Sequence, residues 1–216
     1  MLIASWNVNS IRSRLSQVIN WIKEKHPDVL CLQETKVSDK DFPAEAFLDL
    51  GYKVKFYGQK SYNGVAIISK SNLSDIRFGF NGELNKSDIS NIFTEQKRII
   101  SALIDGIRVI NVYVPNGSSL NSEKFKYKID WLEKLNEYLI MQEQRGEYTC
   151  LLGDFNIALD DKDIHNPEKY SGNIMASEIE RSSLKELLGE RFIDSFRVFE
   201  KFSGHWSWWD YRNNSF

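Results

Sequence analysis

The chain has 216 residues, of which 42% are apolar and 27% charged, and its formal net charge is −2. This length fits a single folded domain over residues 1–216, and the 13 Phe, 9 Tyr and 6 Trp exclude general disorder. The nearly balanced charge gives no overall field that would attract a polyanion, so a nucleic-acid partner has to be inferred from local motifs.

The compartment is predicted from what the sequence lacks. Every apolar run is shorter than the roughly 20 residues that cross a bilayer. Residues 1–6 lack the basic flank and long apolar stretch of a signal peptide. Cys31 and Cys150 lie in apolar runs, which indicates reduced core thiols and not a disulfide framework. We therefore expect a cytoplasmic protein without membrane association.

The first third of the chain alternates strand and helix patterns. Residues 2–6 form a short apolar run typical of a buried strand, and a polar turn follows. Apolar residues at helical spacing over 15–22 predict a helix that ends near Pro27. Residues 29–32 predict a second buried strand. This order favours a layered α/β fold.

The middle of the chain predicts mixed sheets. Strand patterns cover residues 52–57 and 65–69, and two further apolar runs, 99–104 and 107–114, flank Asp105-Gly106. That pair predicts a β-hairpin, which argues against a doubly wound parallel sheet.

The last third returns to alternating elements. A long amphipathic helix is predicted over 121–144, a buried strand over 148–152 and another helix over 177–188. The polar stretch 81–95 is predicted to be a loop. Trp21 and Trp131 fall at helical positions and are interpreted as packing residues. The lysines at 124, 126 and 128 are interpreted as a solvated helix face, with a DNA-facing role as the alternative.

Polar side chains follow the predicted strands at four places. They are carboxylates and amides, whose hard oxygens suit Mg²⁺, Mn²⁺ or Ca²⁺ and do not suit zinc. A Mg²⁺ site needs one or two carboxylates, so Glu34 with Asn7 would suffice. The strand-end residues are Asn7, Glu34, Tyr113 with Asn116, and Asp154 with Asn156.

Each of these motifs also has a structural interpretation. Residues 7–10 could be a simple turn, Glu34 could cap a following helix, and Tyr113 could be a half-buried sheet residue. Asp154 and Asn156 are the sharpest pair. Alternate strand residues point the same way, which would suit a base and the amide that orients it.

Six short motifs occur in order along the whole chain: WNVNSIR (6–12), QETK (33–36), YNGVA (62–66), YVPNG (113–117), GDFNIA (153–158) and WWDYR (208–212). Together they resemble the exonuclease III family of apurinic/apyrimidinic endonucleases. The same fold is shared with inositol-polyphosphate phosphatases, sphingomyelinases and non-specific nucleases, but the QETK and WWDYR forms are similar to the DNA-repair branch.

The resemblance implies a four-layered α/β sandwich in which two mixed β-sheets lie face to face, flanked by helices. It implies Mg²⁺, with Mn²⁺ as a substitute, held by Glu34 with help from Asn7 and Asn9. It also implies metal-dependent phosphodiester hydrolysis at abasic sites in duplex DNA, with 3′–5′ exodeoxyribonuclease activity.

The resemblance also implies roles for the other motif residues. Asp154 would activate water, Asn156 would orient Asp154 or the phosphate, and Tyr113 and Asn116 would contact the scissile phosphate. For DNA binding, Trp208 would lie against the abasic sugar pocket, and Arg12 and Lys36 would lie near the phosphate backbone.

The chain departs from the family pattern at its end. The family places an Arg-x-Asp strand and a Ser-Asp-His motif after the Trp-rich loop, and Phe216 comes before both. We therefore expect a domain truncated at the C-terminus, without its last strands and with impaired activity. His26, His165 and His205 lie outside the strand-end motifs and are interpreted as surface residues.

Two alternatives remain open. A related phosphatase acting on a small phosphorylated or lipid substrate would be favoured by a basic specificity loop, which the sequence does not show. An inactive fragment or a degenerate relative that binds DNA without cutting it would fit the missing end.

Overall fold

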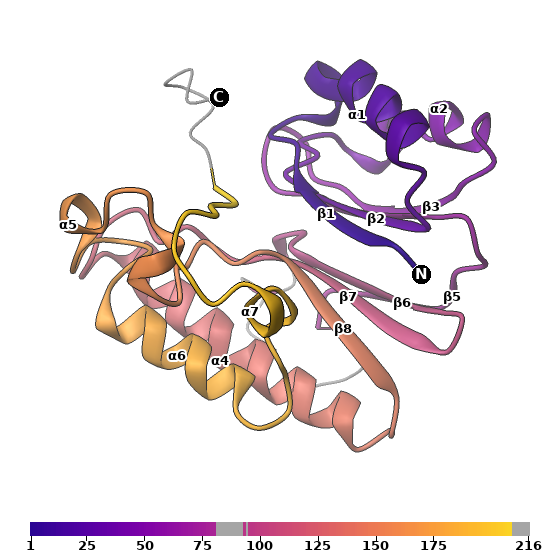
Figure 1. Ribbon diagram of the computed structural model, residues 1–216. Coiled ribbons are helices and arrows are strands. Elements are labelled where there is room, and N and C mark those ends of the chain that lie inside the picture. The colour runs from indigo at the N-terminus through magenta and orange to yellow at the C-terminus, as the bar shows by residue number, and fades with distance from the viewer. Residues whose placement is uncertain (81–92, 94, 209–216) are drawn as a thin grey trace. The chain divides into compact units, whose positions relative to one another are not determined.

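The computed structural model describes residues 1–80, 93 and 95–208. The described part of the chain falls into two compact units (Figure 1). The first unit comprises Met1–Val114 and Lys134–Phe155, and the second comprises Pro115–Glu133 and Asn156–Phe216. Most of the predicted loop over 81–95 and the last four residues of the WWDYR motif lie outside the described residues.

The first unit contains one sheet built from the N-terminal strands, in the order β1-β2-β4-β3. These strands are β1 (Ile3–Asn7), β2 (Val29–Gln33), β4 (Val65–Ser69) and β3 (Lys53–Tyr57). β1 and β2 are parallel because a helix crosses over between them, whereas β4 is antiparallel to both of its neighbours. The predictions for these strands are confirmed to within a residue or two.

A second sheet in the same unit has the order β5-β6-β7-β8. Its strands are β5 (Ser74–Phe78), β6 (Ile99–Ile104), β7 (Ile107–Tyr113) and β8 (Tyr148–Asp154). β6 and β7 form the predicted antiparallel hairpin, and β7 and β8 are parallel. The sequence gives no strand prediction for β5, because its SDIRF sequence is polar at three of five positions and carries little apolar signal.

The two sheets pack face to face through small and β-branched side chains. Alternation along β2 shows the arrangement: Val29 and Cys31 pack with residues of the second sheet, whereas Leu30 and Leu32 pack under the helices on the other side. The shared interior consists of Val29, Cys31, Val65 and Ile67 from one sheet and Ile100, Ala102, Ile104 and Val109 from the other.

Helices cover the outer face of each sheet. On the first sheet lie α1 (Ile11–Lys25) and the short α2 (Glu45–Leu48) (Figure 1). On the second lies the later part of α4 (Glu123–Glu143), where the Tyr138 hydroxyl is 2.9 Å from the Ser101 hydroxyl of β6. The predicted α/β sandwich of two mixed sheets flanked by helices is confirmed.

The helix boundaries follow local capping. α1 begins after Ser10, whose side chain accepts a hydrogen bond from the Ser13 amide, and ends at Lys25, with His26, the residue before Pro27, as its C-cap. His26 takes a left-handed conformation, with φ +48° and ψ +47°, which stops the helix. This end point matches the prediction.

The second unit contains the first part of α4 and a set of shorter helices. They are α5 (Pro167–Tyr170), α6 (Glu178–Leu188) and α7 (Ser195–Phe199), with the 3-10 turn η2 at Asp161–Asp163. The helix predicted over 177–188 is confirmed, with residue 177 as its N-cap. The others are too short to give a periodic signal.

Trp21, Trp131 and the two cysteines follow the sequence predictions. Trp131 is fully buried and Trp21 packs edge-on against Trp6, so both tryptophans are packing residues. Cys31 and Cys150 are free thiols, and burial raises the pKa of each. Every helix in the described ranges is too short or too polar to traverse a lipid bilayer.

Candidate active site

The strand ends of the first unit bring together the predicted carboxylates. Asn7 ends β1 and Asp154 ends β8, while Glu34 directly follows β2. The Asn7 side-chain nitrogen donates to Glu34 Oε1 at 2.9 Å and to Asp154 Oδ2 at 2.7 Å. An amide nitrogen carries two N–H donors, so Asn7 connects the carboxylate beside the first sheet to the carboxylate on the second.

The orientation of Asn7 refines its predicted role. Its nitrogen faces the carboxylates, and its oxygen accepts a hydrogen bond from the Asn9 backbone amide at 2.9 Å. In this arrangement Asn7 sets the positions of Glu34 and Asp154.

Lys36 lies within the carboxylate cluster. Its Nζ is 2.8 Å from Glu34 Oε2, and it donates a hydrogen bond to the Asn9 side-chain oxygen as well. Asn9, Glu34 and Lys36 all have positive φ, at +42°, +51° and +56°. Such values are rare for non-glycine residues, and these turns aim the three side chains at one point.

The alternative role of Glu34 as a helix cap is wrong. The next helical element is the 3-10 turn η1 (Asp39–Asp41), and its N-cap position is Ser38. The segment after Glu34 instead continues the pairing of β1 and β2: the Ser10 amide donates to Glu34 O at 2.7 Å and the Ile11 amide to Thr35 O at 3.1 Å.

Glu34 stays ionised in this environment. Burial acts to raise the pKa of Glu34, but hydrogen bonds from Lys36 and Asn7, the Lys36 charge and the Tyr113 hydroxyl outweigh it. The net effect lowers the pKa of Glu34 below its ordinary value. A carboxylate that keeps its charge at neutral pH suits a cation ligand.

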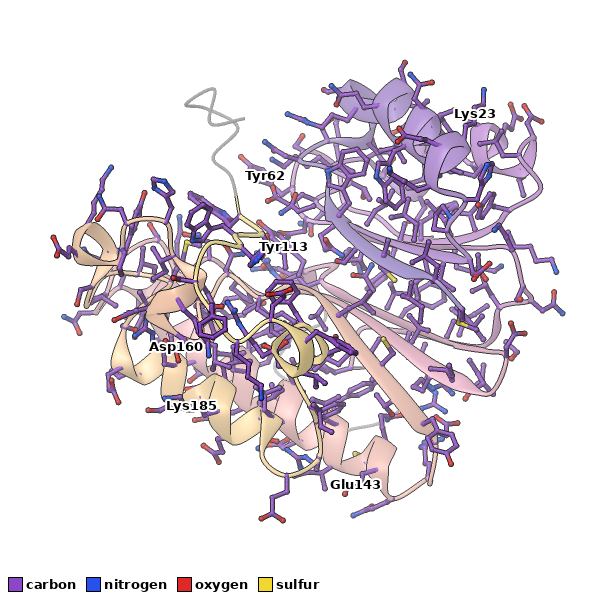
Figure 2. All side chains as sticks on the ribbon, viewed as in Figure 1. Lys23, Tyr62, Tyr113, Glu143, Asp160 and Lys185 are labelled. Carbon is purple, nitrogen blue, oxygen red and sulfur yellow. The ribbon has the colours of Figure 1, made fainter. Side chains whose placement is uncertain are left out.

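Tyr113 lies at the end of β7, where Figure 2 labels it, and its environment keeps the hydroxyl protonated. Burial raises the pKa of its hydroxyl well above the ordinary value, and the negative charge of Glu34 adds to this effect. The Arg98 guanidinium lies 4.7 Å from the ring centroid and donates from Nη1 to Tyr113 O at 3.2 Å. Tyr113 can therefore donate a hydrogen bond throughout the physiological pH range.

Two motif glycines permit close approaches around this cluster. A Cβ on Gly64 would lie 2.1 Å from Thr35 Oγ1, and a Cβ on Gly153 would lie 2.0 Å from Val112 O. Both glycines also have positive φ, at +91° and +142°. The glycines of the YNGVA and GDFNIA motifs are thus required by the backbone that surrounds Glu34 and Asp154.

The predicted geometry of Asp154 and Asn156 is wrong. Asp154 is the last residue of β8, and Asn156 has already left the strand with φ +50°. The rule that alternate strand residues share a side therefore does not apply to this pair. In the second unit, the Asn156 side-chain oxygen instead accepts a hydrogen bond from the Asn116 side-chain nitrogen at 3.2 Å.

The interpretation of Lys128 as a solvated lysine is also wrong. Its side chain is fully buried and paired with Glu180, which is equally buried. Lys126 does follow the prediction, since it is exposed and pairs with Asp130. The sequence signal for Lys128 was its spacing: it lies three residues after Phe125 and four before Leu132, on the apolar face of α4.

The predicted DNA-binding residues Arg12 and Trp208 are both exposed. Arg12 is exposed in the first turn of α1, and Trp208 is 46% exposed in the second unit. The three histidines are exposed, as predicted, and His165 packs edge-on against Trp206 at 4.7 Å.

The donor set of the first unit fits a hard divalent cation. No group of three His, Cys, Asp or Glu side chains that could hold a metal occurs among the described residues. Mg²⁺ characteristically uses one or two carboxylates together with water and substrate oxygens. Glu34, hydrogen-bonded to Asn7, offers that carboxylate, and the Lys36 ammonium already places a positive charge at Glu34.

A two-sheet α/β sandwich with carboxylates and amides gathered at the strand ends defines a class of metal-assisted hydrolases. The chain belongs to the endonuclease/exonuclease/phosphatase family, whose model matches residues 4–216. The resemblance to DNA-repair nucleases is confirmed, and dependence on a divalent metal is a general property of this family.

The chain is similar to named nucleases over nearly its whole length. It is 34% identical to exodeoxyribonuclease III of Haemophilus influenzae, covering 100% of this chain and 82% of the relative. The structure matches a 3′–5′ exonuclease of Neisseria meningitidis with a TM-score of 0.91 at 41% identity, covering 100% and 81% of the two chains. It also matches an AP endonuclease of Archaeoglobus fulgidus with a TM-score of 0.89 at 41% identity, covering 99% and 80%.

Proposed function

We propose that this protein is a Mg²⁺-dependent DNA-repair nuclease that hydrolyses the phosphodiester backbone at abasic sites in duplex DNA and removes nucleotides from 3′ ends. The observation that carries the proposal is the pair of carboxylates, Glu34 and Asp154, bound to one amide at the strand ends. The family and the names of the relatives support DNA as the substrate.

Each residue has a chemical role in this proposal. When bound at Glu34, Mg²⁺ or Mn²⁺ supplies Lewis-acid polarisation of the phosphate and stabilises the leaving oxygen. Asp154 accepts the proton of the attacking water, and Asn7 holds its carboxylate for that purpose. Tyr113 donates a hydrogen bond to the developing charge on the phosphate.

The asparagines and the outlying residues complete the proposal. Asn116 and Asn156 supply amide donors to phosphate oxygens. Trp208 contacts the abasic sugar, and Arg12 and Lys36 favour the DNA backbone through their charge. Selection of an abasic site rests on the lower cost of extruding a sugar that has no paired base. The free thiols support a reducing, cytoplasmic environment.

The decisive experiment measures nicking by the protein on duplex oligonucleotides with and without a single abasic site. We expect cleavage of the abasic duplex in Mg²⁺ or Mn²⁺ and none in excess chelator. Equal cleavage in chelator would contradict the metal-dependent mechanism. Turnover of a small phosphorylated substrate without cleavage of DNA would favour the phosphatase alternative, and DNA binding without cleavage would favour the degenerate relative.

A further inference from the structure

A buried ion pair joins the two asparagine loops of the second unit. Lys128 Nζ donates to Asn156 O at 2.7 Å, to Asn116 O at 3.3 Å and to the carboxylate of Glu180. The side chains of Lys128 and Glu180 are both completely buried. An ammonium has three N–H donors, and these three acceptors come from three different segments.

We propose that Lys128 and Glu180 are positioning residues that hold Asn116 and Asn156 in the geometry needed for phosphate contact. The inference rests on the proposed function, because it assigns the asparagines to the reaction. It adds two residues that the reaction would need although they do not touch the substrate.

The location of Lys128 makes a purely packing role a poor explanation. It lies on the apolar face of α4, between Phe125 and Leu132, where an apolar side chain would fill the same space. Replacing a buried ion pair with apolar residues is often neutral or stabilising. A lysine at this position is explained by what its ammonium holds, namely the main chain of Asn116 and Asn156.

Glu180 is itself fixed by further hydrogen bonds. Its Oε1 accepts from the Met175 amide at 3.0 Å, and its Oε2 accepts from the Ser177 amide at 3.2 Å and the Ser177 hydroxyl at 2.6 Å. Ser177 and Glu180 form the capping box at the start of α6. The ion pair therefore connects the asparagine loops to the rigid start of a helix.

The glycine after Asn116 allows the loop to approach the lysine. A Cβ on Gly117 would lie 3.1 Å from Lys128 Cδ and 2.9 Å from Ile174 Cδ1, and its φ is +88°. Asn116 and Asn156 are also joined through their side chains. A shift of the lysine would thus be transmitted to both asparagines.

The test substitutes Lys128 with methionine, which keeps the length of the side chain and removes its charge. We expect kcat on abasic duplex to fall about a hundredfold, the scale of a displacement of about 1 Å among reacting groups. KM should change little, because contacts made in the transition state are lost. Amide hydrogen exchange of residues 114–118 and 154–158 should become faster.

The matched control is Arg108→Met. Arg108 is also fully buried and paired with carboxylates, but it lies at the start of β7, at the opposite end of the strand from Tyr113 and the Asn116 loop that follows it. This variant should lose stability and keep kcat. If both variants lose kcat equally at matched folded fractions, or if Lys128→Met keeps both kcat and exchange rates, the proposal is wrong.

A conservative variant keeps the test decisive if Lys128→Met does not fold. Lys128→Arg retains the charge opposite Glu180 but replaces a point-like ammonium with a planar fork. We expect kcat to lie between those of the wild type and a charge-free variant, about tenfold below the wild type, with a matching increase in the exchange rates of both asparagine loops. A fall in kcat with wild-type exchange rates in both loops would overturn the proposal. Absence of nicking by the wild type would instead refute the proposed function, while the exchange data would still report on loop positioning.

Discussion

The two ends of the parallel strands β7 and β8 differ in how their charged side chains are paired. The starting end lies at Ile107 and Tyr148, and the finishing end lies at Tyr113 and Asp154. At the starting end, Arg108 donates from Nε to Glu147 at 2.8 Å and from Nη1 to the Asp75 backbone oxygen at 2.7 Å, and it also pairs with the Asp75 carboxylate. Arg77 pairs with Asp75 as well. Two arginines thus meet two carboxylates, so the charges at this end are matched.

At the finishing end, two carboxylates accept hydrogen bonds from the same uncharged side-chain amide. Glu34 and Asp154 both accept from Asn7, and the cation bonded to Glu34 is Lys36. Tyr113 and Glu143, labelled in Figure 2, help to locate the two ends within the first unit. The ion pairs of the starting end, called the matched end below, stabilise the fold. The finishing end has two carboxylates beside Lys36, and this negative charge can bind a divalent cation.

The largest effect is expected at the finishing end. Asp154→Asn removes the proposed base and keeps the shape of the side chain, so kcat should fall about a thousandfold, or ~4 kcal/mol in activation free energy. The midpoint of thermal unfolding should stay within a few degrees of the wild type. Single-turnover nicking and a melting curve measure the two quantities, and a loss below tenfold would remove Asp154 from the role of base.

The matched end should show the reverse pattern. Arg108→Met leaves Glu147 and Asp75 without the buried arginine, which should lower the free energy of unfolding by about 3 kcal/mol. Turnover per folded molecule should not change. Urea unfolding and active-site titration separate the two quantities, and a loss of kcat would mean that the two ends are coupled.

The sequence predicts the parts of this comparison that depend on local pattern. The strands that end at Asn7 and Tyr113, and the strand that precedes Glu34, are rich in apolar residues, and α4 and α6 have clear helical spacing, so the sequence predicts these elements. The oxygen-rich chemistry of the site could also be predicted, because side chains at the ends of parallel neighbours gather at one edge.

Long-range contacts decide what the sequence could not show. Arg108 and Lys128 are charged residues whose burial depends on partners 39 and 52 positions away, at Glu147 and Glu180. The direction of the Asn7 amide follows from Asp154, which is 147 positions distant. The left-handed conformation of Asn156 ends the strand period that the pattern assumed.

Acidification provides a smaller test of the matched end. The hydrogen bond from Arg108 lowers the pKa of Glu147, so the stability that this carboxylate contributes is present above its unfolded pKa. That stability is lost as the pH falls through the lower, folded pKa. We expect Glu147→Gln to cost about 1.5 kcal/mol at pH 7. Because the wild type loses the same contribution in acid, the difference in free energy of unfolding between the wild type and Glu147→Gln should shrink below about pH 4.

The free energy of unfolding of the wild type and of Glu147→Gln, measured from pH 7 to pH 3, tests whether the stability difference shrinks in acid. The two free energies of unfolding could instead differ by the same amount at every pH. That result would show that the glutamine acts through packing and not through the lost charge. Asp75 is a useful reference, because its pKa is also lowered by Arg77 and Arg108. The stability difference between the wild type and Asp75→Asn should likewise become smaller in acid.

The smallest expected effect is the response of the finishing end to metal. A ligand that binds the folded state at five times its Kd stabilises that state by about 1 kcal/mol. Mg²⁺ should therefore raise the melting temperature of the wild type by a few degrees. Glu34→Gln removes the carboxylate charge and should abolish the increase, whereas Glu147→Gln should retain it. Equal increases in all three proteins would mean that Mg²⁺ acts elsewhere, and the difference between the two strand ends would then lie in hydrogen bonding instead of cation binding.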